Sequence, residues 1–124
     1  MSTVKTGLRY SDDHEWLADG EPAEIGISQI AADRLGEIVY VDLPEVGAEL
    51  AIGEVFGEIE STKSVAELYA PVSGEVVEVN GAAVDDPATI NADAYGAWLV
   101  KVRVADEGPL LTAEEYAAAN DVEL

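Results

Sequence analysis

A single lysine stands apart from the other basic residues of the chain. Lys63 is the only Lys or Arg between Arg34 and Lys101, whereas acidic residues occur throughout that interval. A lysine amine can be acylated, can form a Schiff base with a carbonyl group, or can simply carry charge in a weak surface ion pair. Lys63 has the small polar neighbours Thr62 and Ser64, and a strand-like segment lies on each side of them. We therefore interpret Lys63 as a candidate for covalent chemistry, with an ordinary solvated lysine as the alternative.

The chain around Lys63 has the pattern of an antiparallel β protein. β-Branched residues and alternating hydrophobicity predict strands near residues 7–10, 14–17, 22–27, 37–42, 55–60, 65–69, 74–79 and 97–104. The connections are too short for the crossovers that parallel strands require. Pro44-Glu45-Val46-Gly47 and Asn80-Gly81 are expected to be turns, the second a tight reversal with positive φ. Lys63 then lies at the tip of the hairpin made by the strands near 55–60 and 65–69.

Capping patterns predict two helices. Ser28 can cap a short helix near 28–35 that ends at Gly36. Thr112 and Glu115 match a capping box at the start of a C-terminal helix near 112–119. Asp86-Pro87 can open a further single turn, with Pro87 at the first helical position.

Two segments 38 positions apart share a sequence pattern. They are Gly36-Glu37-Ile38-Val39-Tyr40-Val41 and Gly74-Glu75-Val76-Val77-Glu78-Val79. Two similar halves of this size favour a small sandwich or flattened barrel with pseudo-two-fold symmetry, and chance similarity between short strands is the alternative.

Composition limits the partners that the chain can bind. Its 124 residues, 48% of them hydrophobic, are enough for one domain over 1–124 with a modest core. The formal net charge of −20 disfavours nucleic acids and membranes, because both present negative phosphate groups. There is no cysteine, and no signal peptide or membrane-spanning run is found in the sequence. We expect a cytoplasmic protein without a metal site.

Several motifs, in the same order, resemble one family over almost the whole chain. The segment from Glu60 to Val76, which contains Lys63, resembles the lipoyl-lysine segment of the H protein of the glycine cleavage system. Further blocks similar to that family are Tyr10-Ser11-Asp12-Asp13-His14-Glu15-Trp16, Leu35-Gly36-Glu37-Ile38-Val39-Tyr40-Val41-Asp42-Leu43-Pro44 and Leu110-Leu111-Thr112-Ala113-Glu114-Glu115-Tyr116. The resemblance implies a mainly β fold, a small antiparallel barrel-sandwich hybrid of the lipoyl/biotinyl type. An N-terminal extension and a C-terminal helix would complete it.

The same resemblance implies a carrier protein, not an enzyme. A lipoate ligase or lipoyl transferase would join lipoate to Lys63 through an amide bond. The P protein (glycine decarboxylase) would load an aminomethyl group and the T protein (aminomethyltransferase) would receive it. The L protein (dihydrolipoyl dehydrogenase) would reoxidise the dithiol. No residue of this chain would be catalytic.

The resemblance also implies a cleft that protects the aminomethyl group, which water would otherwise break down. The amine of that group is cationic and requires carboxylates in a dry site. By motif position the carboxylates are Glu15, Glu67 and Asp13. Asp13 departs from the family, in which this position is often a small hydroxyl residue. His14, the only histidine, is interpreted as structural.

Other functions also use a lysine on a hairpin. An H-like lipoyl relay protein and the lipoyl domain of a 2-oxo acid dehydrogenase complex are the alternatives within the same class. A biotinyl domain normally has methionine on both sides of its lysine, where Thr62 and Ser64 stand here. A Schiff-base enzyme requires a neutral amine, and the nearby Glu58, Glu60 and Glu67 favour the charged form instead.

Overall fold

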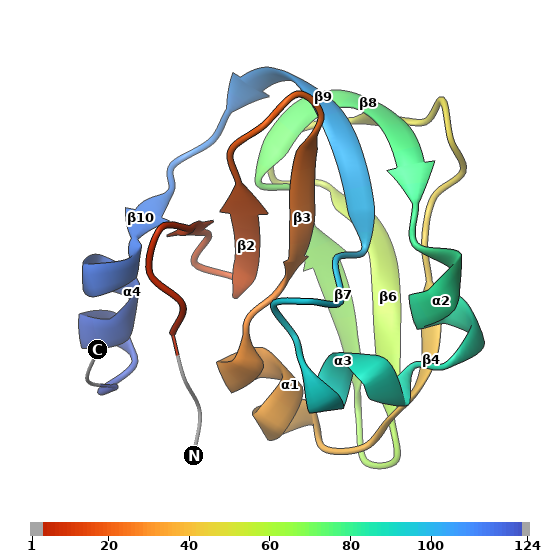
Figure 1. Cartoon of the computed structure of the whole chain (residues 1–124), viewed down its shortest axis with the longest axis vertical. Helices are drawn as coiled ribbons and strands as arrows, with labels where there is room; N and C mark the ends of the chain where they lie inside the picture. Colours follow the sequence, from red (N-terminus) through yellow and green to blue (C-terminus); the bar gives the residue numbers. More distant parts are fainter. Residues whose placement is uncertain (1–3, 123–124) are drawn as a thin grey trace.

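Two antiparallel sheets make up most of the fold. Figure 1 shows the computed structural model, which describes residues 4–122 as ten strands and four short helices. One sheet has the order β10 (Leu111–Thr112), β1 (Arg9–Tyr10), β2 (Glu15–Ala18), β3 (Ala23–Ile27), β9 (Val100–Glu107), β8 (Val72–Val79) and β5 (Glu49–Leu50). The other has the order β4 (Ile38–Asp42), β6 (Val55–Ser61) and β7 (Val65–Tyr69). All the pairs between these strands are antiparallel.

The core follows from alternation along the strands, because successive residues point to opposite faces of a sheet. In β8, for example, Val72, Gly74 and Val76 are buried and the residues between them are less so. Burying each large apolar side chain contributes roughly 1.5–3 kcal/mol. Three clusters result. They include Ile38, Ile59, Leu68, Ile90 and Leu99 in the first, Leu17, Ile25, Val72, Val76 and Val102 in the second, and Tyr10, Trp16 and Tyr116 in the third.

Helices cover the edges of these clusters. The first cluster also receives side chains from α1 (Gln29–Leu35), α2 (Gly81–Asp85) and α3 (Ala88–Ala92). The C-terminal helix α4 (Ala113–Ala119) packs on the third. None of the helices within residues 4–122 has both the length and the hydropathy needed to cross a membrane.

The predicted fold class is confirmed. The chain is mainly antiparallel β and corresponds to a barrel-sandwich hybrid, although the two sheets do not close into a barrel. Of the two segments that share a sequence pattern, one forms β4 and the other lies in β8. They therefore belong to different sheets, and the two-fold relation between the halves stays a prediction.

Both predicted helix caps are confirmed. The Ser28 hydroxyl accepts a hydrogen bond from the Ala31 N–H at 3.2 Å, and α1 ends at Gly36. The Thr112 hydroxyl accepts from the Glu115 N–H at 3.1 Å, and the Glu115 carboxylate accepts from the Thr112 N–H at 2.9 Å. Each cap satisfies backbone donors that a helix N-terminus leaves without partners.

The predicted reversal at Asn80-Gly81 is wrong. Asn80 has φ −80° and caps α2, and Gly81 is the first residue of that helix. The Asn80 side chain accepts from the Ala82 N–H at 3.2 Å and donates to the Trp98 carbonyl at 2.6 Å. Asparagine suits a helix N-cap as well as a turn, and burial of Ala83 favours the helix here. The single helical turn predicted at Asp86-Pro87 is observed as α3, with Pro87 as its N-cap instead of its first residue.

A close contact between Trp16 and Gly26 fixes β2 on β3. A Cβ atom at Gly26 would lie 2.5 Å from Trp16 Cζ2, so only glycine leaves room for the indole ring. The indole N–H donates to the Ala94 carbonyl at 3.2 Å. This contact fixes the strand that begins at Glu15.

Candidate functional site

Lys63 lies in the tight connection between β6 and β7. The Ser61 N–H donates to the Ser64 carbonyl at 2.8 Å, which closes the turn. The Ser61 hydroxyl accepts from the N–H groups of Lys63 at 3.3 Å and Ser64 at 3.1 Å. Small hydroxyl residues stabilise turns in this way. Backbone groups and Ser61 therefore hold the turn, and the Lys63 side chain is exposed.

The hairpin tip is attached to the segment that follows α1. The Thr62 N–H donates to the Glu37 carbonyl at 3.0 Å. In Figure 1 the tip of the β6–β7 hairpin lies at the lower end of the molecule, beside the loop between α1 and β4. Lys63 is therefore presented at one end of the fold on a hairpin that is fixed at its tip.

Glu15 is almost completely buried, with 1% of its surface exposed. The Ser11 hydroxyl donates to Glu15 Oε1 at 2.5 Å, and the Tyr69 N–H donates to Oε2 at 3.2 Å. Ser11 precedes β2 and Tyr69 ends β7, so the Glu15 carboxyl group connects the two sheets.

Burial raises the pKa of Glu15 to about 7, against its ordinary value of 4.5. The hydrogen bonds from Ser11 and from the Tyr69 backbone act in the opposite direction, because they favour the charged carboxylate. The negative charge of Asp13 adds a smaller upward effect. Glu15 consequently changes its charge near neutral pH, unlike an exposed glutamate.

We compare the free energy of unfolding of the wild type with that of a Glu15→Gln variant. The contribution of Glu15 to this free energy should be larger at pH 4.5 than at pH 7.5. Between about pH 4.5 and 7 the folded protein holds a proton on Glu15 that the unfolded chain releases, so this contribution falls as pH rises. Its full size is about 3 kcal/mol, since one pKa unit corresponds to about 1.4 kcal/mol. Urea unfolding of both proteins from pH 4.5 to 7.5 measures it, and a pH-independent difference would contradict it.

Tyr69 contacts two of the three predicted carboxylates. Its N–H binds Glu15, and its hydroxyl lies 3.5 Å from Glu67 Oε1. The pKa of Tyr69 is raised, first by the charge of Glu67 and then, with smaller effects, by desolvation and by Asp13 and Glu15. Asp13 and Glu67 are exposed, whereas Glu15 is buried. Glu15 and Glu67 therefore contact the same tyrosine, and Asp13 is linked to Glu15 through the Ser11 hydroxyl.

Ser11 and Tyr69 are the members of this group that the sequence did not identify. Ser11 is buried, and its hydroxyl also accepts from the N–H groups of Asp13 at 3.2 Å and Glu15 at 3.1 Å. A serine four residues before a glutamate is a weak signal by itself. The contact of Tyr69 with Glu15 spans 54 positions and has no local signal in the sequence.

His14 has the structural role that was predicted. Its Nδ1 atom is hydrogen-bonded to the Tyr116 hydroxyl, which also bonds the Ser28 hydroxyl at 2.7 Å. The Tyr116 ring stacks on Tyr10 with 4.3 Å between the ring centroids. Burial lowers the pKa of His14, and the charge of Arg34 lowers it further. This cluster connects α4 to the segment that begins β2.

A shallow hollow of about 160 Å³ adjoins the carboxylate group. Ser11 and Asp13 line one side, and Ile52, Ala70 and Pro71 give it apolar walls. Its combination of apolar walls and a nearby carboxylate suits a small cationic group.

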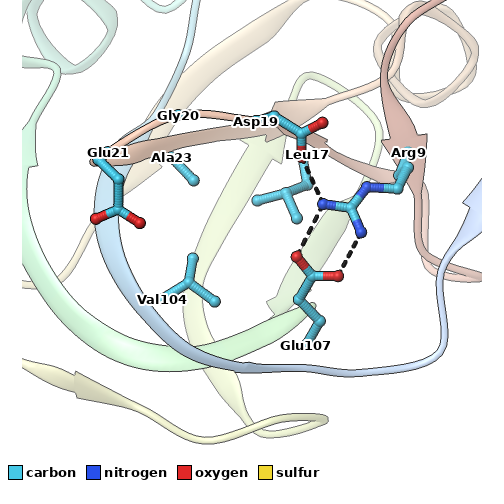
Figure 2. Close-up of a pocket in the computed structure, with 8 residues that line it drawn as sticks. All are labelled: Arg9, Leu17, Asp19, Gly20, Glu21, Ala23, Val104 and Glu107. Carbon is cyan, nitrogen blue, oxygen red and sulfur yellow. Dashed lines mark hydrogen bonds and ion pairs between the residues drawn. The ribbon is translucent and has the colours of Figure 1, made fainter.

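A larger hollow of about 370 Å³ lies at the turn between β2 and β3. That turn is at the opposite end of the molecule from the β6–β7 tip in Figure 1. Figure 2 shows that its arginine, Arg9, is bound by Glu107 and by Asp19, the latter at 2.6 Å. Because Arg9 is neutralised and Lys63 is distant, we do not assign the function to this hollow.

An exposed lysine on a fixed hairpin tip of an antiparallel β sandwich is the arrangement expected of a swinging-arm carrier domain. Residues 8–122 match the family model described as glycine cleavage H-protein. The chain belongs to this family.

Relatives agree with the family assignment over nearly the full length. The chain is 52% identical to the glycine cleavage system H protein of Corynebacterium jeikeium, over 98% of this chain and 100% of the relative. It is 52% identical to that of Streptomyces coelicolor, over 90% and 92% of the two chains. The crystal structure of a glycine cleavage system H protein from Mycobacterium marinum has a TM-score of 0.92 at 50% identity, and covers 96% of this chain and 100% of that one.

Proposed function

We propose that this chain is the lipoyl carrier protein of the glycine cleavage system and that Lys63 is the residue to which lipoate is attached. The observation that carries the proposal is the exposed Lys63 at the β6–β7 tip, in a chain that matches the glycine cleavage H-protein family over residues 8–122. The chain acts as one carrier domain over 1–124 in the cytoplasm and catalyses no step itself. Its partners are the P, T and L proteins and a lipoate ligase or lipoyl transferase.

The surroundings of Lys63 fit the attachment of an acyl group. Thr62 and Ser64 are also exposed, so an acylating enzyme can enclose the tip. The turn is held by backbone groups and by Ser61, so acylation of the Lys63 amine breaks none of its hydrogen bonds. The attached lipoyl group supplies a disulfide that can accept an aminomethyl group and be restored from the dithiol.

Glu15, Glu67 and Asp13 form the proposed site for the amine of the aminomethyl group. The contacts of Glu15 and Glu67 with Tyr69, and the link from Asp13 to Glu15 through Ser11, support this role, because a cationic amine in a partly dry site requires paired carboxylates. The apolar walls at Ile52, Ala70 and Pro71 would exclude water from the carbon–sulfur bond.

Expression with lipoate and a lipoate ligase tests the attachment site. We expect peptide mapping to find one lipoyl group, on Lys63, and none on Lys5 or Lys101. Lys101 lies 4.6 Å from the centre of the Trp98 ring and 3.6 Å from Glu78, so its amine is less accessible. Lipoylation elsewhere, or none, would contradict the assignment.

Combining the lipoylated protein with the P, T and L proteins and glycine tests its place in the system. We expect glycine-dependent release of carbon dioxide. A lipoylated Lys63 that fails to support this release would favour the lipoyl relay protein instead.

A further inference from the structure

The Lys63 side chain lies against the backbone of Gly36. A Cβ atom built on Gly36 would be 3.2 Å from Lys63 Cε, and 3.8 Å from both Cδ and Nζ. The first of these distances is shorter than an ordinary van der Waals contact, so a methyl group at residue 36 would push the lysine side chain away by a few tenths of an ångström. We name this the Gly36 contact.

Hydrogen bonds at residues 36 and 37 hold both Gly36 and the hairpin tip that carries Lys63. The Gly36 N–H donates to the Ala32 carbonyl at 3.2 Å, and its own carbonyl accepts from Asn91 Nδ2 at 2.8 Å. The next residue, Glu37, accepts the hydrogen bond from Thr62 that holds the hairpin tip. Gly36 and Lys63 are therefore held in register by hydrogen bonds in which the lysine amine takes no part.

Helix α1 connects the hairpin tip to the segment that contains Asp13 and Glu15. At its start, the N–H of the N-cap residue Ser28 donates to the His14 carbonyl at 2.8 Å, and His14 precedes Glu15 directly. At its other end, Gly36 is followed by Glu37, which is bonded to the hairpin tip. An arm that lies across the end of α1 therefore lies on the helix that reaches that segment.

We propose that Gly36 is a positioning residue for the arm on Lys63. The absence of a side chain lets the aliphatic part of the arm lie across the end of α1, in the direction of the carboxylate group. The inference deepens the proposed function and rests on it. Its physical effect is to restrict the first bonds of a long flexible arm, so that less conformational freedom is lost when the far end enters the hollow.

A glycine with φ +83° is also favoured by its backbone conformation alone, and the experiment must separate the two effects. Gly47 offers a matched control. It has φ +94°, and no atom lies within 4 Å of a Cβ built there. Gly36→Ala and Gly47→Ala both place a side chain at a residue with positive φ, and only the first changes the space beside Lys63.

The first measurement uses the protein without lipoate. We expect nuclear Overhauser effects between the Lys63 ε-methylene and the Gly36 α-protons, and slower motion of that methylene than of the one in exposed Lys5. Both features should persist in Gly47→Ala, and in Gly36→Ala the Lys63 ε-methylene should move as fast as that of Lys5. If the wild-type Lys63 ε-methylene moves like that of Lys5 and gives no such effect, the inference is overturned, even where Gly36→Ala does not fold.

The second measurement uses the lipoylated proteins loaded with the aminomethyl group. We expect the lifetime of the loaded protein to fall by about two- to ten-fold in Gly36→Ala and to stay near the wild-type value in Gly47→Ala. Equal lifetimes in the two variants would overturn the inference but leave the attachment site intact. Absence of lipoate on wild-type Lys63 would instead overturn the proposed function, so the two failures are distinguishable.

Discussion

Replacing Lys63 by arginine is expected to abolish both lipoylation and glycine-dependent release of carbon dioxide. Arginine keeps the positive charge, but its guanidinium group stays protonated in water and provides no nucleophilic amine for amide formation. The side chain is exposed and the turn is held by Ser61 and backbone groups, so the variant should unfold at the wild-type denaturant concentration. Intact mass, urea unfolding and the reconstituted reaction measure the three outcomes.

Lys101→Arg is the matched control for Lys63→Arg. It also exchanges one cation for another, at a residue paired with Glu24 and Glu78 on the seven-stranded sheet. We expect normal lipoylation and normal release of carbon dioxide. A Lys63→Arg protein that still acquires a lipoyl group would show that the attachment site lies elsewhere.

The position of Lys63 could be predicted because the signals are local. Alternating strands on both sides and small hydroxyl residues between them specify a hairpin without reference to the rest of the fold. The helix caps at Ser28 and Thr112 are local in the same sense. Asn80 shows the limit of such signals, because the same residue suits a turn and a helix cap. The choice depends on burial of Ala83 and on a bond to Trp98, which are tertiary contacts.

The arrangement of the carboxylates could be predicted only in part. Motif position identified Glu15, Glu67 and Asp13, and their role in binding an amine stays a prediction. The burial of Glu15 could not be foreseen, because it depends on pairing between β2 and β3 and on a bond to Tyr69 from the other sheet. The strands β5 and β10 were missed, since two residues are too short to show alternation.

Replacing Glu15 by glutamine is expected to shorten the lifetime of the aminomethyl-loaded protein by at least about ten-fold. A hydrogen bond to a charged group contributes about 1.5–3 kcal/mol, and 1.4 kcal/mol corresponds to a factor of ten. Glutamine has nearly the same shape and can still accept from Tyr69, so lipoylation of Lys63 and reoxidation of the unloaded dithiol should be unaffected. The measurement is the decay of isolated loaded protein at pH 7.5.

Glu49→Gln is the control, because Glu49 is an exposed acid on β5 and its loss changes the net charge by the same amount. Glu67→Gln and Asp13→Asn should have smaller effects, since both residues are exposed and water weakens their interaction with the amine. Equal lifetimes in Glu15→Gln and Glu49→Gln would mean that the apolar walls alone protect the group.

The raised pKa of Glu15 allows a second, independent measurement of whether the amine lies beside this residue. In the unloaded protein the carboxyl group is partly protonated near neutral pH, since its pKa is about 7. Ser11 and Tyr69 each donate one hydrogen bond to it, and a carboxylate has lone pairs for more. A cationic amine that approaches it favours the charged form, so loading should lower the pKa of Glu15. Carbon-13 NMR of the Glu15 carboxyl group, titrated with and without the aminomethyl group, measures this shift. An unchanged pKa would place the amine away from Glu15 even if the lifetimes differ.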